Sequence, residues 1–96
     1  MAPKELQVLR DKLGLSRAAL ARFLGVAEMT VVRWESGDAT TPKGLVLTVL
    51  TAVHIALENH GGTAVTRIIR ESAVDHGRGL RALFELAYGR PQRRKP

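Results

Sequence analysis

The apolar residues of this chain recur at the three- and four-residue spacing of α-helices. Three short stripes open it: Leu6, Leu9 and Leu13; Leu20, Phe23 and Leu24; Val31 and Trp34. Each stripe is followed by a glycine of the kind that favours a helix C-terminus: Gly14, Gly25 and Gly37. Ser16 is a good N-cap for the second stripe. The pattern therefore predicts three short helices before residue 38, with a turn at Gly25 between the second and the third.

Longer stripes follow in the second half. Thr41 is predicted to cap a fourth helix with Pro42 in its first turn, and the stripe of this helix is Leu45, Val49, Leu50, Val53 and Leu57. Residues 63–76 and 79–88 also fit helices. Because no segment shows sustained alternation with period two, the chain is predicted to be an all-α protein of five to six short helices.

Composition limits what such a chain can be. Its 96 residues suffice for one modest core, which must be aliphatic because aromatic residues make up only 4%. Cysteine is absent, which excludes disulfides and thiolate chemistry. The chain opens without the apolar core of a signal peptide, and its longest uncharged run, residues 44–57, is too short for a membrane span. We expect a cytoplasmic protein that has no membrane segment.

The net charge of +6 favours a polyanionic partner, but composition alone supports nucleic acid only weakly. Residues 1–42 hold six Lys and Arg against five acids, whereas residues 43–96 hold nine against four. Four of the late bases lie in the Pro-rich end, so residues 89–96 are predicted to form a basic, disordered tail. This tail could supply phosphate contacts or act only as a solubilising end.

The helix after the Gly25 turn has an unusual outward face. With Val31 and Trp34 directed inward, the outward positions are Glu28, Met29, Val32 and Arg33. Two of these four side chains are apolar, and thymine methyl groups in a DNA major groove would give them a partner. The alternatives stay open: ordinary surface apolarity for Met29 and Val32, an Arg33–Glu28 pair on a solvated face, and a helix-dipole preference for an acid at Glu28.

Over residues 5–42 the chain resembles the phage-repressor-like helix-turn-helix family of the Cro and XRE type. The segments that carry the resemblance are "LRDKLGLS", "LARFLGV" and "VVRWESG", with Pro42 after them. The resemblance implies a lambda-repressor-like fold whose third helix lies in the major groove of duplex DNA. It also implies a transcriptional repressor that binds paired half-sites as a dimer.

The resemblance assigns roles by position. The base-contacting candidates are Glu28, Met29, Val32 and Arg33, and the phosphate-contacting candidates are Ser16, Arg17, Thr30 and Lys43. Arg10 and Glu35 form a candidate structural ion pair between the first and third helices. Trp34 is expected to be mainly structural, packed beneath the following loop. Two departures from the family pattern matter: Ala27 leaves the third helix without a side-chain cap, and Glu28 places an acid at the groove.

The second half carries more aliphatic surface than a helix-turn-helix unit needs for its own core. We expect a homodimer interface built from Leu57, Ile68, Ile69, Leu80, Leu83, Phe84 and Tyr88. The predicted organisation is a DNA-binding domain over residues 1–60 with its helix-turn-helix at 16–37, a dimerising helical extension over 61–88, and the tail. Such a dimer would bind a palindromic operator with half-sites about 34 Å apart.

Other functions are weighed against this one. An antitoxin-like module would use the later helices or the tail to capture a protein partner while its helix-turn-helix represses the shared operon, and a nonspecific DNA-coating protein would ignore sequence. No metal or cofactor site is expected, because His54, His60 and His76 lack ligand spacing. No enzyme is expected either, because Ser72, Asp75 and His76 lack an oxyanion turn. His54 is predicted to pack at an interface.

Overall fold

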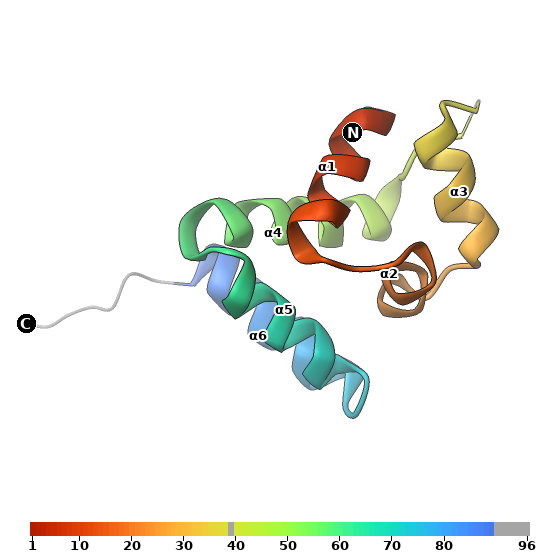
Figure 1. The fold of residues 1–96 in the computed structure, drawn as a ribbon. Coiled ribbons are helices and arrows are strands. Elements are labelled where there is room, and N and C mark those ends of the chain that lie inside the picture. The colour runs from red at the N-terminus through yellow and green to blue at the C-terminus, as the bar shows by residue number, and fades with distance from the viewer. Residues whose placement is uncertain (39, 90–96) are drawn as a thin grey trace, which may run out of the picture. The chain divides into compact units, whose positions relative to one another are not determined.

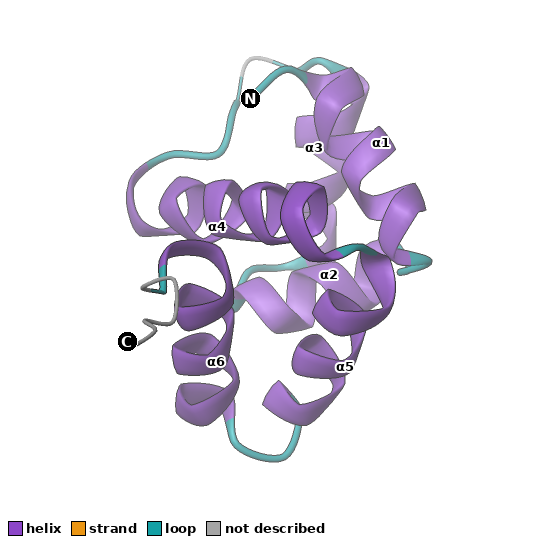
Figure 2. Cartoon of the chain, turned by 90° about the vertical axis from the view of Figure 1, so that its left-hand side faces the viewer, coloured by secondary structure: helices purple, strands orange, loops and turns teal. Residues whose placement is uncertain are grey.

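A computed structural model describes residues 1–38 and 40–89 of the chain, and every regular element in these ranges is a helix (Figures 1 and 2). The helices are α1 (Pro3–Leu13), α2 (Arg17–Leu24), α3 (Glu28–Ser36), α4 (Gly44–His60), α5 (Gly62–Ser72) and α6 (His76–Tyr88). The all-α prediction is thus confirmed. The predicted tail, apart from Gly89, lies outside the described residues.

The chain divides into two compact units, and the boundary between them falls inside α4. We call Met1–Thr51 the N-terminal unit and Ala52–Pro96 the C-terminal unit. The N-terminal unit contains α1, α2, α3 and the first half of α4, and the C-terminal unit contains the rest of α4 with α5 and α6. The division after Thr51 precedes the boundary expected from sequence at residue 60, where α4 ends.

The turn between α2 and α3 depends on Gly25. This residue has φ 75° and ψ 30°, a left-handed conformation that glycine adopts without the steric cost of a Cβ atom. Its N–H and that of Val26 donate to carbonyl groups in the last turn of α2, so the chain leaves the helix with its backbone satisfied. Gly14 and Gly37 end α1 and α3 in the same way, as the sequence predicts.

The starts of α2 and α3 differ as the sequence predicts. The Ser16 hydroxyl accepts a hydrogen bond from the Ala19 N–H at 3.0 Å, which caps α2. Ala27, at the corresponding position of α3, makes no side-chain cap. The helix that carries the candidate base contacts therefore begins with fewer of its N–H groups satisfied by side chains.

The N-terminal unit is held by a buried aliphatic core and two aromatic rings. Both α1 and α2 pack against α3. The buried apolar residues of this unit are Leu6, Leu9, Leu13, Leu20, Ala21, Phe23, Val31, Trp34, Val49 and Leu50. Ala21 is the small residue that the sequence places in α2 four positions before the turn glycine, and it is buried. This packing fixes which face of α3 is turned inward and which is left to solvent.

In the C-terminal unit α5 and α6 lie side by side, joined by a short loop (Figure 2). The buried apolar residues here are Ala52, Val53, Ala56, Leu57, Val65, Ile69 and Leu83. The two helices are in close contact at Ser72 and Gly79, both buried. A Cβ atom placed on Gly79 would lie 2.7 Å from the Ser72 Cα, so only glycine fits there without a shift of backbone.

Two sequence-based details were wrong. Thr41 does not cap α4, which begins at Gly44; the φ of 58° at Gly44 prevents a right-handed helix from running through it from Thr41. The segment predicted as one helix over 63–76 ends at Ser72, because the Asp75 side chain accepts from the Arg78 N–H and caps α6 instead. His54, expected at an interface, is exposed on α4 in the single chain, so its packing against a partner stays a prediction.

Candidate nucleic-acid interface

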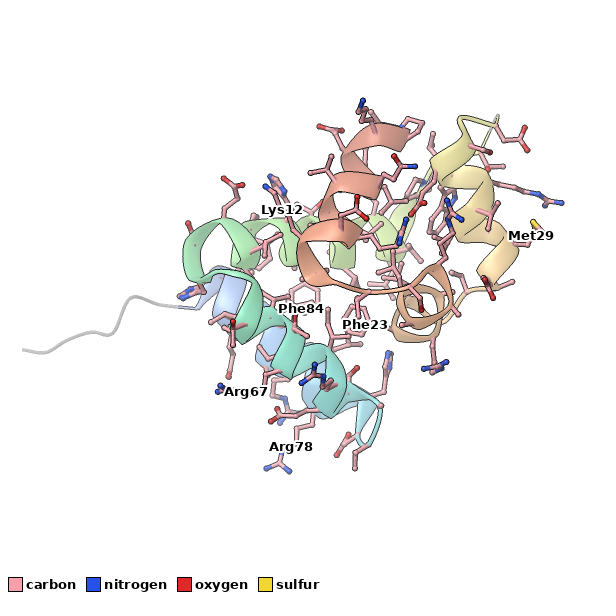
Figure 3. The ribbon with its side chains drawn as sticks, in the orientation of Figure 1. Lys12, Phe23, Met29, Arg67, Arg78 and Phe84 are labelled. Atoms are coloured by element: carbon pink, nitrogen blue, oxygen red, sulfur yellow. The ribbon has the colours of Figure 1, made fainter. Side chains whose placement is uncertain are left out.

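The outward face of α3 carries most of the side chains predicted to touch bases. Glu28, Met29 and Arg33 are exposed, and Met29, which is 57% exposed, points outward from the helix (Figure 3). Val32, which was expected to face outward with them, is half-buried, so only part of it is accessible. A flexible apolar side chain therefore stands in solvent between an acid and a guanidinium group.

The inward face of α3 anchors the helix in the N-terminal unit. Val31 is completely buried, and Trp34 and Glu35 are buried beside it. A helix with two anchoring residues one turn apart cannot rotate about its axis without exposing apolar surface. The inward residues thus determine the direction in which Glu28, Met29 and Arg33 project.

A buried carboxylate joins α1, α2 and α3. The Arg10 Nε donates to Glu35 Oε2 at 2.6 Å, and the Arg10 Nη2 donates to Glu35 Oε1 at 3.1 Å. The Arg10 Nη1 also donates to the Leu15 carbonyl at 3.0 Å. The Arg17 Nε donates to Glu35 Oε1 at 2.9 Å. The Arg10–Glu35 pair that the sequence suggested is therefore part of a three-residue cluster, and sequence reasoning missed the third member, Arg17.

The electrostatics of the cluster favour the charged state. Burial of the Glu35 side chain, which is 1% exposed, works against its charge, but hydrogen bonds from Arg10 and Arg17 outweigh burial and hold the pKa of Glu35 below its ordinary value. The hydrogen bond to Glu35 likewise raises the pKa of Arg10 despite partial burial. The cluster therefore stays ionised at neutral pH and connects three helices.

The two phosphate candidates at the start of α2 have different surroundings. Ser16 is exposed, and its hydroxyl oxygen accepts from the α2 backbone. Arg17 is also exposed, with 44% of its side chain accessible, while its Nε is bound to Glu35. Since a guanidinium group has five N–H donors in a fixed plane, this bond leaves the outer edge of the group available to an anion.

A hollow of about 340 Å³ lies between the end of α3 and the start of α4, within the N-terminal unit. The residues that line it are Thr30, Arg33, Trp34, Thr40, Thr41 and Lys43. Hydroxyl groups and two cations make this hollow suited to an oxyanion. Sequence reasoning named Thr30 and Lys43 as phosphate contacts and missed Thr40 and Thr41; the pair of threonines just before Pro42 was the available signal.

The residues proposed for a dimer interface fall into two groups. Leu57, Ile69 and Leu83 are buried by the chain itself, so their apolar side chains do not require a second copy. Ile68, Leu80 and Phe84 are half-buried, and Tyr88 is exposed. The rings of Phe84 and Tyr88 stack with centroids 6.1 Å apart. Of the residues predicted for the interface, this second group is the part accessible to a second copy.

Neither a cluster of metal ligands nor a membrane-spanning helix is found among the described residues. Within residues 1–38 and 40–89, no three His, Asp or Glu side chains gather in a way that could hold a metal ion. None of the helices in the described part of the chain combines the length and the apolar character needed to cross a membrane.

Comparison with known protein families gives one match. Residues 6–52 match a family model described as helix-turn-helix, of the Cro and XRE type. The match covers most of α1, all of α2 and α3, and the first half of α4. It nearly coincides with the N-terminal unit, which also holds the buried ionic cluster, the exposed face of α3 and the hollow. Searches of curated proteins and of solved structures found no match.

Proposed function

Because the chain belongs to the Cro and XRE family of helix-turn-helix DNA-binding regulators, we propose that it is a sequence-specific repressor that reads duplex DNA with α3. The observation that carries this proposal is the exposed face of α3, where Met29 stands in solvent between Glu28 and Arg33 while Val31 and Trp34 anchor the opposite face. An α-helix presented in this way fits the width of the major groove.

Each exposed side chain of α3 has a chemically matched base edge. The Arg33 guanidinium can donate two hydrogen bonds to the O6 and N7 atoms of guanine, and the Glu28 carboxylate can accept from the N4 amino group of cytosine. Met29 and the accessible part of Val32 can contact thymine methyl groups. Glu28 also repels phosphate oxygens, so it contributes to specificity by penalising binding in the wrong register.

The phosphate contacts are proposed to flank this helix. Ser16 and Arg17 lie at the start of α2, and Thr30 and Lys43 line the hollow beside α3. Contacts to phosphates position the protein on the duplex without reading its sequence. Each cationic contact should add roughly −0.9 to the slope of log affinity against log salt.

We further propose that the active form is a cytoplasmic homodimer on a palindromic operator, which represses its own or a neighbouring operon. Support for the dimer comes from the partly exposed apolar residues of the C-terminal unit, among them Phe84 and Tyr88. In a two-fold symmetric dimer the two α3 helices would lie about 34 Å apart, one turn of DNA.

The first test is selection of the full chain on a pool of random duplexes at moderate salt, followed by sequencing of the retained DNA. We expect a palindrome with half-sites one helical turn apart. Retention of duplexes without enrichment of any sequence would contradict sequence-specific recognition. A single unpaired half-site would contradict the dimer but preserve the role of α3.

The second test asks whether a side chain of α3 contacts a base. Arg33→Ala should relax the preference at one base pair in each half-site and weaken binding to the selected duplex by about 1–3 kcal/mol. Lys12→Ala is the matched control, because Lys12 is an exposed cation on α1 that has no proposed DNA contact (Figure 3). Equal losses for both variants would show that Arg33 contributes only charge.

A further inference from the structure

The Glu35 cluster contains one more arginine than a structural ion pair needs. Arg10 alone reaches both carboxylate oxygens of Glu35, at 2.6 and 3.1 Å, and it is largely buried with 14% of its side chain exposed. This two-point contact already fixes the geometry of the carboxylate. The bond from Arg17, at 2.9 Å to Oε1, comes from a side chain that remains 44% exposed.

The position of Arg17 in the chain makes its presence less easy to explain by stability. Arg17 is the first residue of α2, where the partial positive charge of the helix end disfavours a cation. The N-cap of α2 is already supplied by Ser16. The charge is therefore unfavourable for α2 itself, and the bond to Glu35 on α3 offsets this cost within the protein.

The geometry of the Arg17–Glu35 bond indicates a further role for the Arg17 side chain. A free arginine side chain samples many rotamers, and it loses this freedom when it binds a ligand. Here Nε donates to a buried carboxylate, which restricts the orientations of the Arg17 guanidinium before any ligand arrives. The Nη groups at the outer edge of that plane are donors with the spacing that suits two oxygens of a phosphate.

We propose that Glu35 is a positioning residue for DNA binding, which holds the Arg17 guanidinium so that its outer edge grips a backbone phosphate. This inference rests on the proposed function, since it takes duplex DNA as the ligand. The two arginines of the cluster then have different roles. Arg10 joins α1 to α3 through Glu35, and Arg17, held by the same carboxylate, contacts a phosphate of the DNA backbone.

The decisive comparison is Arg17→Lys against Arg17→Ala in the full chain. Lysine keeps the charge but cannot donate from an Nε while offering a planar edge to phosphate. We expect both variants to bind the selected duplex about tenfold more weakly than the wild type. The alanine variant should also flatten the salt slope by about 0.9, whereas the lysine variant should keep it. Arg17→Lys binding as tightly as the wild type would overturn the proposal.

Arg22 provides the matched control, because it is an exposed arginine in the last turn of the same helix. Arg22→Lys should leave the affinity unchanged, and thermal unfolding of each variant checks that it is folded. If Arg22→Lys weakens binding as much as Arg17→Lys does, the effect belongs to arginine in general and positioning by Glu35 is excluded.

A double-mutant cycle tests Glu35 directly. Glu35→Gln should weaken DNA binding in the wild-type background and should have little further effect on binding in the Arg17→Ala background. Equal effects in the two backgrounds would mean that Glu35 acts on DNA binding only through the fold, which would overturn its positioning role.

The outcome is separable from that of the proposed function. A phosphate contact does not depend on base sequence, so the Arg17 variants can be compared on any duplex that the chain retains. Loss of sequence selection with the Arg17 effects intact would refute the sequence-specific repressor and leave the positioning role standing.

Discussion

The two units of this chain hold their helices together by different kinds of contact. In the N-terminal unit a buried carboxylate receives bonds from two arginines and joins three helices. In the C-terminal unit α5 and α6 meet at Gly79 and Ser72, where no Cβ atom stands on the glycine side. Ionic hydrogen bonds fix direction as well as distance, whereas close apolar packing fixes mainly distance. The unit proposed to present a helix to DNA is thus the one with the directional contacts.

Arg10→Met should cause the largest loss of stability, and the loss should fall on the N-terminal unit. It leaves the Glu35 carboxylate buried with only the bond from Arg17, and removal of one partner from a buried pair costs about 3–5 kcal/mol. Urea unfolding followed by circular dichroism measures the loss. Lys12→Met, an exposed change on the same helix, should stay within about 0.5 kcal/mol of the wild type. Similar values for the two variants would show that the cluster does not hold the helices together.

Acid should weaken the same ionic cluster, with a smaller loss of stability than Arg10→Met causes. The pKa of Glu35 is lower in the folded chain than in the unfolded chain, so its contribution to stability is complete above the unfolded value of about 4.3 and disappears as the pH falls through the folded value. The difference in unfolding free energy between the wild type and Glu35→Gln should therefore be constant near neutral pH and shrink below about pH 4. A difference that grows in acid would contradict the direction of the pKa shift.

Gly79→Ala tests the contact that characterises the C-terminal unit. The added Cβ would approach the Ser72 Cα to 2.7 Å, and backbone atoms cannot move aside as a side chain can, so we expect a loss of about 1–3 kcal/mol. Gly77→Ala is the matched control on the same helix, since its nearest neighbour would be Asp75 Oδ1 at 3.9 Å. That variant should gain up to about 1 kcal/mol from better helix propensity. Thermal unfolding of both gives the comparison, and a gain for both would show that α5 and α6 are not in close contact.

Ala27→Ser should have the smallest effect and should sharpen the contrast between α2 and α3. A hydroxyl at this position can accept from an N–H in the first turn of α3, as Ser16 does in α2, and should stabilise the chain by about 1 kcal/mol. Ala18→Ser, placed inside α2, lacks this role and should not stabilise the chain. Equal gains for the two variants in thermal unfolding would rule out capping as the cause.

Local signals in the sequence were sufficient for the helix-turn-helix. Ser16, Gly25 and Gly37 act on their immediate neighbours, so their roles could be inferred without knowledge of the fold. The start of α4 was misplaced because two competing signals, the Thr41–Pro42 pair and Gly44, stand close together, and a left-handed φ at Gly44 decides between them. The end of α5 was missed because Asp75 fits a helix by periodicity while its side chain favours a cap.

The candidate site was less accessible to sequence reasoning because it depends on contacts between distant residues. The outward positions Glu28, Met29 and Arg33 follow from helical periodicity. The bond between Arg17 and Glu35 joins residues on different helices, and their spacing in the sequence does not predict it. The half-burial of Val32 likewise depends on how α3 is seated among its neighbours rather than on its own pattern.

The boundary inside α4 has a consequence for how this protein can be taken apart. A chain ended at Thr51 would keep only about two turns of α4, which is shorter than the length at which helices persist in water without support. The matching fragment that begins at Ala52 would start with N–H groups stripped of the carbonyl partners they have in the intact helix. Since each fragment would inherit a frayed end of α4, truncation at this boundary should destabilise both the helix-turn-helix and the α5–α6 pair, although each has its own buried residues.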